Sequence, residues 1–155
     1  MHEQFMKRAI ELSRKNLETG AGGPFGAVIV KDGVIIGEGH NKVTSTNDPT
    51  AHAEVTAIRD ACKNLSQFDL SGSVIYTSCE PCPMCLAAIY WARIEKIFYA
   101  NTRKDAADIK FDDDFIYEEI PKDISQRKIP MQQCCHSDAL KVFNEWENKV
   151  DKIPY

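Results

Sequence analysis

One histidine and two cysteines have the residue types and the spacing of a transition-metal site. His52 lies two residues before Glu54, and Cys82 and Cys85 are three residues apart at the expected start of a helix. Side chains three apart on a helix share one face, and the unpaired N–H groups of a first helical turn favour the thiolate form of cysteine. The pattern therefore predicts one zinc ion held by His52, Cys82 and Cys85.

The number of ligands predicts what kind of zinc site this is. A structural zinc has four protein ligands, whereas a catalytic zinc keeps one position for water. His52, Cys82 and Cys85 leave one position open. On a regular helix Glu54 would point away from His52, but at a helix end, with the ion beyond the terminus, it can reach the metal-bound water. The sequence thus predicts that Glu54 carries protons.

Cys79 allows two other interpretations of the same cysteines. As a fourth ligand it would complete a structural zinc site, which would leave Glu54 without a role. In an iron–sulfur protein the cysteine run would continue with a fourth cysteine at position 89, where the sequence has Ile89. A zinc-stabilised scaffold or an inactive paralogue is the non-enzymatic alternative, and it would have no need of Glu54.

Alternating helices and strands are predicted around these residues, in one α/β domain over residues 1–155. A hairpin turn at Asp32-Gly33, followed by strand–helix units, favours a partly parallel sheet covered on both faces. The expected elements are a helix up to Gly20, strands at 25–30 and 34–37, a helix at 51–65, a strand at 73–77, a helix at 83–91, a strand at 96–100 and a helix at 138–150. Residues 101–133 follow no pattern that assigns them.

The helix at 51–65 matters most, because it carries His52 and Glu54 at its start. Thr50 is expected to cap it. Its expected buried face consists of the apolar residues at helical spacing, which are Ala51, Val55, Ile58, Cys62 and Leu65.

The composition is that of an ordinary globular protein, with 43% hydrophobic and 27% charged residues in a chain of 155. No apolar run approaches the roughly 20 residues of a membrane span, and the N-terminus has no signal-peptide core. We therefore expect a cytoplasmic protein with no membrane partner. A net charge of −4 argues against nucleic acid, because phosphate binding uses clustered Lys and Arg. In a reducing compartment the six cysteines favour free thiols and metal ligands over disulfides.

The paired motifs His-x-Glu and Pro-Cys-x-x-Cys are those of zinc nucleobase deaminases. Through them the chain resembles the cytidine deaminase superfamily, which implies a three-layer α/β/α fold with a central mixed sheet of about five strands. Four segments are similar to the bacterial guanine deaminases, namely residues 22–28, 47–54, 89–93 and 111–113. The resemblance extends from about Met1 to Tyr117 and resumes at Tyr155.

The resemblance implies a reaction, the hydrolytic deamination of guanine to xanthine and ammonia. Zinc-bound hydroxide would attack C2 of the purine, since bound water becomes acidic near neutral pH. Glu54 would move the water proton to ring nitrogen N3, a transfer that typically supplies about 10²–10⁴ in rate. Asp113, which matches an acidic residue near the substrate in the family, would assist departure of the amino group.

The resemblance also implies a set of substrate contacts. Asn41 would hydrogen-bond the purine edge, the backbone N–H of Ala53 would orient the base, and the rings of Phe25 and Trp91 would stack on it. Each has a structural alternative. Asn41 could satisfy turn backbone, Phe25 and Trp91 could be core aromatics, and Asp113 lies in an acidic run that is usually solvated.

Two other deaminases share the same metal motifs. A tRNA adenosine deaminase would have to hold an anticodon stem, which needs a basic surface around the pocket. Here Arg103, Lys104 and Lys110, beyond the last expected strand, are offset by Asp105, Asp108, Asp112 to Asp114, Glu118 and Glu119. A cytosine deaminase attacks C4 of a smaller ring, and the motifs alone do not exclude it.

The C-terminal segment predicts a homodimer. The helix and tail at about 137–155 are expected to be exchanged with a partner subunit, where Tyr155 would close over the substrate. The resemblance to the tail of the guanine deaminases suggests this arrangement. His40, His136, Cys134 and Cys135 have no partner spacing that indicates a site, and they are expected to be structural or exposed.

Overall fold

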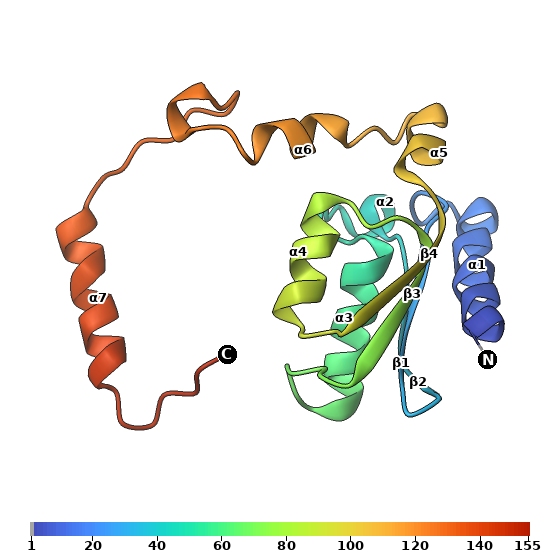
Figure 1. Cartoon of the computed structure of the whole chain (residues 1–155), viewed down its shortest axis with the longest axis horizontal. Coiled ribbons are helices and arrows are strands. Elements are labelled where there is room, and N and C mark those ends of the chain that lie inside the picture. The colour runs from blue at the N-terminus through green and yellow to red at the C-terminus, as the bar shows by residue number, and fades with distance from the viewer. Residues whose placement is uncertain (1) are drawn as a thin grey trace. The chain divides into compact units, whose positions relative to one another are not determined.

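The structure is a computed structural model that describes residues 2–155, and it divides into two units between Asp113 and Asp114. The elements of the first unit are α1 (His2–Thr19), β1 (Gly26–Lys31), β2 (Val34–His40), α2 (Val43–Thr46), α3 (Ala53–Leu65), β3 (Ser73–Cys79), α4 (Pro83–Trp91), β4 (Lys96–Asn101) and α5 (Arg103–Asp108). Those of the second unit are α6 (Asp114–Glu119), the 3₁₀ helix η1 (Ile124–Gln126) and α7 (His136–Asn148) (Figure 1).

The first unit is built on a mixed sheet with the strand order β2-β1-β3-β4. β1 is antiparallel to both β2 and β3, whereas β3 and β4 are parallel. The described residues contain four strands, where about five were expected. After β4 the chain enters α5 directly, with a capping box between Thr102 and Asp105 at the start of that helix.

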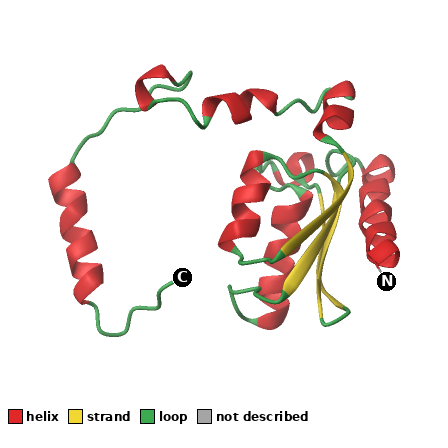
Figure 2. Ribbon diagram, in the orientation of Figure 1, coloured by secondary structure: helices red, strands yellow, loops and turns green. Residues whose placement is uncertain are grey.

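Helices cover both faces of the sheet, so the predicted three-layer arrangement is confirmed (Figure 2). On one face α1 supplies Phe5 and Leu12, which pack against Val28 and Val30 of β1. On the other face α3 and α4 pack against Ala27 and Ile29, the alternate residues of the same strand. Because both faces of β1 are covered, its residues 26–30 are all buried and read as one continuous apolar run.

The buried face of α3 differs from the expected one. Its innermost residues are Ala53, Ala57 and Ala61, all fully buried, while Ile58 and Cys62 pack only at the margin of the core and Leu65 is exposed. Small side chains face inward because α3 lies very close to β2. A Cβ atom added at Gly39 would lie 2.3 Å from the Ala53 carbonyl oxygen, and one at Gly37 would lie 2.6 Å from the Ala61 Cβ.

The predicted cap of α3 is also wrong. The helix begins at Ala53 with His52 as its N-cap, and no side chain caps it. Thr50 lies three residues before the first residue of the helix, and its hydroxyl donates to Asp48 Oδ1 at 2.6 Å.

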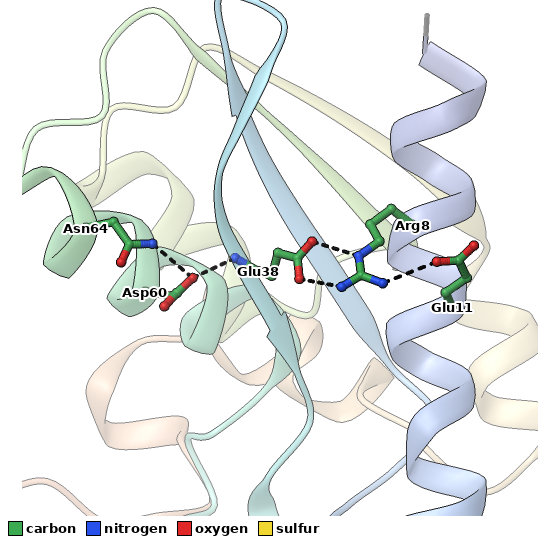
Figure 3. Close-up of polar contacts among 5 residues, drawn as sticks. All are labelled: Arg8, Glu11, Glu38, Asp60 and Asn64. Carbon is green, nitrogen blue, oxygen red and sulfur yellow. Dashed lines mark hydrogen bonds and ion pairs between the residues drawn. The ribbon is translucent and has the colours of Figure 1, made fainter.

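A chain of polar contacts joins α1, β2 and α3 at the outer edge of the sheet (Figure 3). Arg8 donates two hydrogen bonds of 2.7 Å to the Glu38 carboxylate, which hold the pKa of that carboxyl below its usual value. The backbone N–H of Glu38 donates to Asp60 Oδ2 at 2.9 Å, and Asn64 also donates to Asp60. β2 is an edge strand, so these contacts occupy a backbone N–H that no further strand pairs with.

The helices of the second unit have no buried residues. The helix expected at 138–150 lies at His136–Asn148. Across the part of the chain that the structure describes, no helix is both long and apolar enough to cross a membrane.

The close contact between α3 and β2 gives the first prediction. Gly39→Ala should lower the free energy of unfolding by about 1–3 kcal/mol, because the new methyl group meets helix backbone that cannot move aside. Denaturant unfolding of the two proteins measures the difference. Val34→Ala is the control, since Val34 lies in the same strand but is exposed, and it should change stability by no more than about 0.5 kcal/mol. Equal losses in both variants would contradict the packing argument.

Candidate functional site

Two helix N-termini of the first unit meet at the predicted metal site. His52 is the N-cap of α3 and Cys82 is the N-cap of α4, with nearly identical backbone angles of φ −66°, ψ 159° and φ −66°, ψ 167°. Pro83 occupies the first position of α4, where proline fits because that N–H has no helical partner. Cys85 follows in the first turn and is fully buried. The loop after β3 therefore brings both thiols to the start of α3.

The distances between these groups match a tetrahedral zinc site. His52 Nδ1 lies 3.6 Å from Cys82 Sγ and 3.5 Å from Cys85 Sγ. Zinc bonds of about 2.3 Å to sulfur and about 2.0–2.1 Å to nitrogen place tetrahedral ligands about 3.6 Å apart. The ligand atoms of His52, Cys82 and Cys85 all lie within 4.8 Å of one another. The donor set thus fits zinc with one position left for another ligand.

Cys79 has a different environment from the other two thiols of the loop. Its Sγ donates to the carbonyl oxygen of Thr102 at 3.5 Å, and burial raises the pKa of the thiol to about 11. Cys79 therefore connects the end of β3 to the start of α5, and it is not part of the group that could hold the ion.

The pKa values of the two candidate thiol ligands shift in opposite directions. A hydrogen bond from Cys85, and then one from His52, lower the pKa of Cys82 to about 4. The neighbouring Cys82 thiolate, and then burial, raise the pKa of Cys85 far above its usual value. The hydrogen bond with Cys82 also raises the pKa of His52. Of the two thiols, Cys82 therefore ionises first, and Cys85 keeps its proton to higher pH.

Glu54 lies beside these ligands in the first turn of α3. Its side chain is buried, with 6% of the residue exposed, and burial raises the pKa of its carboxyl. A hydrogen bond with Cys85 partly offsets that rise, which places the carboxyl next to the thiol. A buried carboxyl with a raised pKa can both accept and hold a proton near neutral pH.

Asn41 is buried at the end of β2 and is held by its backbone and its side chain. Its N–H donates to the Phe25 carbonyl oxygen at 3.0 Å, and its Oδ1 accepts from the Val43 N–H at 3.1 Å. The second contact is a turn of the kind that asparagine commonly makes. It occupies only the oxygen of the amide, so the Nδ2 group is the part that can face a ligand.

Phe25 and Asp113 are connected through Phe111, a contact that the sequence did not predict. The rings of Phe25 and Phe111 meet edge to face, 5.0 Å apart at an angle of 89°. Asp113, two residues later, is half-buried, and its charge contributes to raising the pKa of both His52 and Cys79. Phe25 thus supports the segment that brings Asp113 toward the candidate metal ligands.

The remaining predicted aromatic contacts are exposed. Trp91 is 68% exposed at the end of α4, which excludes the alternative of a core aromatic, and with Ala87 and Tyr90 it lines an open pocket. Tyr155 is 73% exposed and belongs to the second unit. The stacking role of Trp91 and the closure of Tyr155 over the substrate stay predictions.

Among the residues without an assigned role, Cys134, Cys135 and His136 are exposed, as expected. His40 is half-buried and has a partner, Asn16, which the sequence did not indicate.

Comparisons with known proteins add to this geometry. A family model described as the cytidine and deoxycytidylate deaminase zinc-binding region matches residues 1–101. The guanine deaminase of Bacillus subtilis (strain 168) is 56% identical over 154 residues, which are 99% of this chain and 99% of the relative. An X-ray structure of guanine deaminase from Bacillus subtilis covers 100% of this chain and 99% of its own, with 56% identity and a TM-score of 0.96.

Two more distant relatives cover less of the chain. A structure of the guanine deaminase from Nitrosomonas europaea has 33% identity and a TM-score of 0.67, and it covers 70% of this chain and 63% of its own. The tRNA-specific adenosine deaminase of Aquifex aeolicus (strain VF5) is 44% identical over 102 residues, 66% of this chain and 67% of the relative. By contrast, the match to the guanine deaminase of Bacillus subtilis covers 99% of this chain and so includes the second unit as well as the first.

The opposite pKa shifts of the two thiols predict that zinc binding depends on pH. Zinc requires two thiolates, so its binding should release the Cys85 proton, and zinc affinity should fall as the pH is lowered and His52 is protonated too. Calorimetric titration of metal-free protein in buffers of different ionisation enthalpy counts the protons. Cys85→Ser should weaken binding by more than the roughly 10–100-fold that outer-shell partners cost. Cys134→Ser, at an exposed thiol, should bind as the wild type does. An affinity that is independent of pH would rule out this ligand set.

Proposed function

The chain belongs to the cytidine and deoxycytidylate deaminase zinc-binding family, and we propose that it is the member of that family that converts free guanine to xanthine and ammonia. One observation carries this proposal. The match to the guanine deaminase of Bacillus subtilis covers 99% of the chain, whereas the match to a tRNA-specific adenosine deaminase covers 66%. The zinc-binding region is common to both, so the added match in the second unit distinguishes them.

The proposed ligands are His52, Cys82 and Cys85, which form the only group of one histidine and two cysteines with metal-ligand spacing among the described residues. Zinc held there supplies a Lewis acid that lets a water molecule lose its proton near neutral pH. Cys79 is occupied with Thr102, which supports three ligands rather than a closed site of four.

Glu54 would carry the protons of the reaction. It takes the proton of the attacking water and delivers it to purine N3, which opens C2 to attack. Its burial and raised pKa let it hold the proton between the two transfers. Asp113 would assist the second proton transfer, with which the 2-amino group leaves as ammonia. One guanine and one water thus give one xanthine and one ammonia.

The purine would be held by groups at the C-terminal end of β2 and at the start of α3. Asn41 Nδ2 is a donor, and it suits the acceptors N7 and O6 that guanine offers along one edge. The Ala53 N–H is one of the N–H groups that a helix start leaves without a helical partner. Phe25, whose ring meets that of Phe111 edge to face, would stack on the base.

The residues after β4 support a free base rather than RNA as the substrate. Within residues 102–119, Arg103, Lys104 and Lys110 are outnumbered by exposed or half-buried acidic side chains, which are Asp105, Asp108, Asp112, Asp113, Asp114, Glu118 and Glu119. Phosphate binding needs an excess of positive charge, which this segment does not offer.

The second unit supports a homodimer in which residues of about 137–155 are exchanged. Its helices bury nothing, and the unit exposes large apolar side chains both in its helices and between or after them, including Phe115, Ile129, Leu140, Phe143, Trp146 and Tyr155. Such side chains need a covering surface, and a second copy of the chain would supply one.

Free thiols throughout the described chain suit the reducing conditions of the cytoplasm.

Ammonia release from guanine, adenine, cytosine, cytidine and a tRNA anticodon stem-loop, offered side by side, tests the proposed substrate. Guanine should be turned over and the others not. Glu54→Gln should keep its zinc and lose about 10²–10⁴ in kcat. Glu11→Gln is the matched control on an exposed glutamate and should stay fully active. Preference for the stem-loop would overturn the substrate, and native turnover in Glu54→Gln would overturn the mechanism.

Removal of the last three residues tests the role of the tail. The loss of Tyr155 should raise KM roughly 5–150-fold, because stacking of a base on an aromatic ring is worth about 1–3 kcal/mol. Tyr155→Phe keeps the ring and should behave nearly as the wild type.

A mixing experiment shows whether the tail is exchanged. The truncated chain keeps Glu54 but lacks the tail, and full-length Glu54→Gln keeps the tail but lacks the proton carrier. In a mixed dimer the only active site is therefore that of the truncated subunit. Its KM should be low only if the tail of the partner subunit closes over that site. Truncated protein that gains nothing from mixing would place the tail in its own subunit.

A further inference from the structure

The inner face of α1 ends on a buried polar residue. The helix buries Phe5, Ala9, Leu12 and Asn16, and of these Asn16 is the one with a side-chain amide, only 4% exposed. Burying an amide costs free energy unless its donors and acceptor find partners. An apolar side chain would satisfy the packing of α1 without that requirement, so the contacts of Asn16 are informative.

All the polar atoms of the Asn16 side chain have partners. Its Nδ2 donates to the Gly23 carbonyl oxygen at 2.6 Å and to the Asn41 carbonyl oxygen at 2.8 Å. Its Oδ1 lies 2.8 Å from His40 Nδ1. Carbonyl oxygens only accept, so the orientation of the amide is fixed and His40 must donate through Nδ1. The amide thus joins three segments, α1, the loop before β1 and the end of β2.

These contacts hold the residue that is proposed to bind the purine. Asn41 donates its N–H to Phe25, accepts at its carbonyl oxygen from Asn16, and accepts at Oδ1 from Val43. Without Asn16, the buried Asn41 carbonyl oxygen would lose the N–H donor that Asn16 Nδ2 provides. A buried polar group left unpaired costs about 1–3 kcal/mol.

Gly22 supplies an independent observation on the same arrangement. A Cβ atom added there would lie 2.1 Å from Asn41 Oδ1 and 2.7 Å from the Asn41 carbonyl oxygen. The loop before β1 therefore lies directly against the Asn41 side chain, and Asn16 holds that loop through the adjacent residue, Gly23. A shift of either segment would displace the amide that faces the ligand.

We propose that Asn16 is a positioning residue of the substrate pocket, which acts on the purine through Asn41 and not by contact. It joins the loop at Gly22-Gly23 to the end of β2, so that the Asn41 amide is fixed before the base arrives. Preorganised groups bind more tightly because less freedom is lost on binding. The proposal rests on the proposed function, in which Asn41 contacts the base.

A double-mutant cycle with Asn41 tests the proposal. Asn16→Ala should raise KM for guanine about tenfold with little change in kcat, since the amide holds a binding group and not a proton carrier. In an Asn41→Ala background the same change should alter KM by less than about twofold, because the residue through which Asn16 acts is gone. Asn16→Asp keeps the shape but has no N–H donors, so it should match Asn16→Ala.

Leu12→Ala is the control on the same helix face. It should lower the melting temperature by creating a cavity while KM stays that of the wild type. An unchanged KM in folded Asn16→Asp, or an equal effect of Asn16→Ala with and without Asn41, would overturn the proposal. If another base proves to be the substrate, the proposed function fails, and the same cycle run with that base still decides the role of Asn16.

Discussion

The position at which α3 begins is the constraint on which the rest of the site depends. His52 is the N-cap and Glu54 the second helical residue, so a shift of one residue would move both groups away from the thiols of α4. That position is fixed by packing, because a Cβ at Gly39 would meet helix backbone at 2.3–2.4 Å. The helix therefore has no room to slide along β2. The positions of the candidate metal ligands thus depend on residues that are not themselves candidate ligands. These are Gly37 and Gly39 of β2 and Ala53, Ala57 and Ala61 of α3.

The same geometry brings together more negative charge than a buried site holds without a cation. In the metal-free protein the charge is reduced by keeping protons: the pKa of Cys85 rises beside the Cys82 thiolate, and that of Glu54 rises with burial. A divalent cation held there would balance both thiolates and would allow the Cys85 proton to leave. Metal binding and the protonation of the site are therefore linked, and part of the binding free energy offsets the cost of burying ionised groups.

The parts of the site that the sequence predicted are local in the chain. His52 with Glu54, and Cys82 with Cys85, each lie within one helical turn, and the structure brings the two pairs together. The prediction of the buried face of α3 was wrong, because it assumed that large apolar residues face inward. The close approach of α3 to the glycines of β2 leaves space only for alanine. Contacts between distant residues, such as Asn16 with Asn41 or Phe25 with Phe111, had no local pattern from which they could be predicted. The number of about five strands was implied by the resemblance, and the described residues form four.

Zinc and a proton carrier do not by themselves select a base, since the zinc-binding region of this family serves guanine and tRNA adenosine deaminases alike. Selection must come from the groups around the pocket and from what can reach it. In the proposed dimer a tail that closes over the site can enclose a free purine, but an anticodon loop still joined to its stem could not be enclosed. The second unit would then do two things at once: cover the apolar surfaces of a partner and restrict the substrate to a base that fits entirely inside.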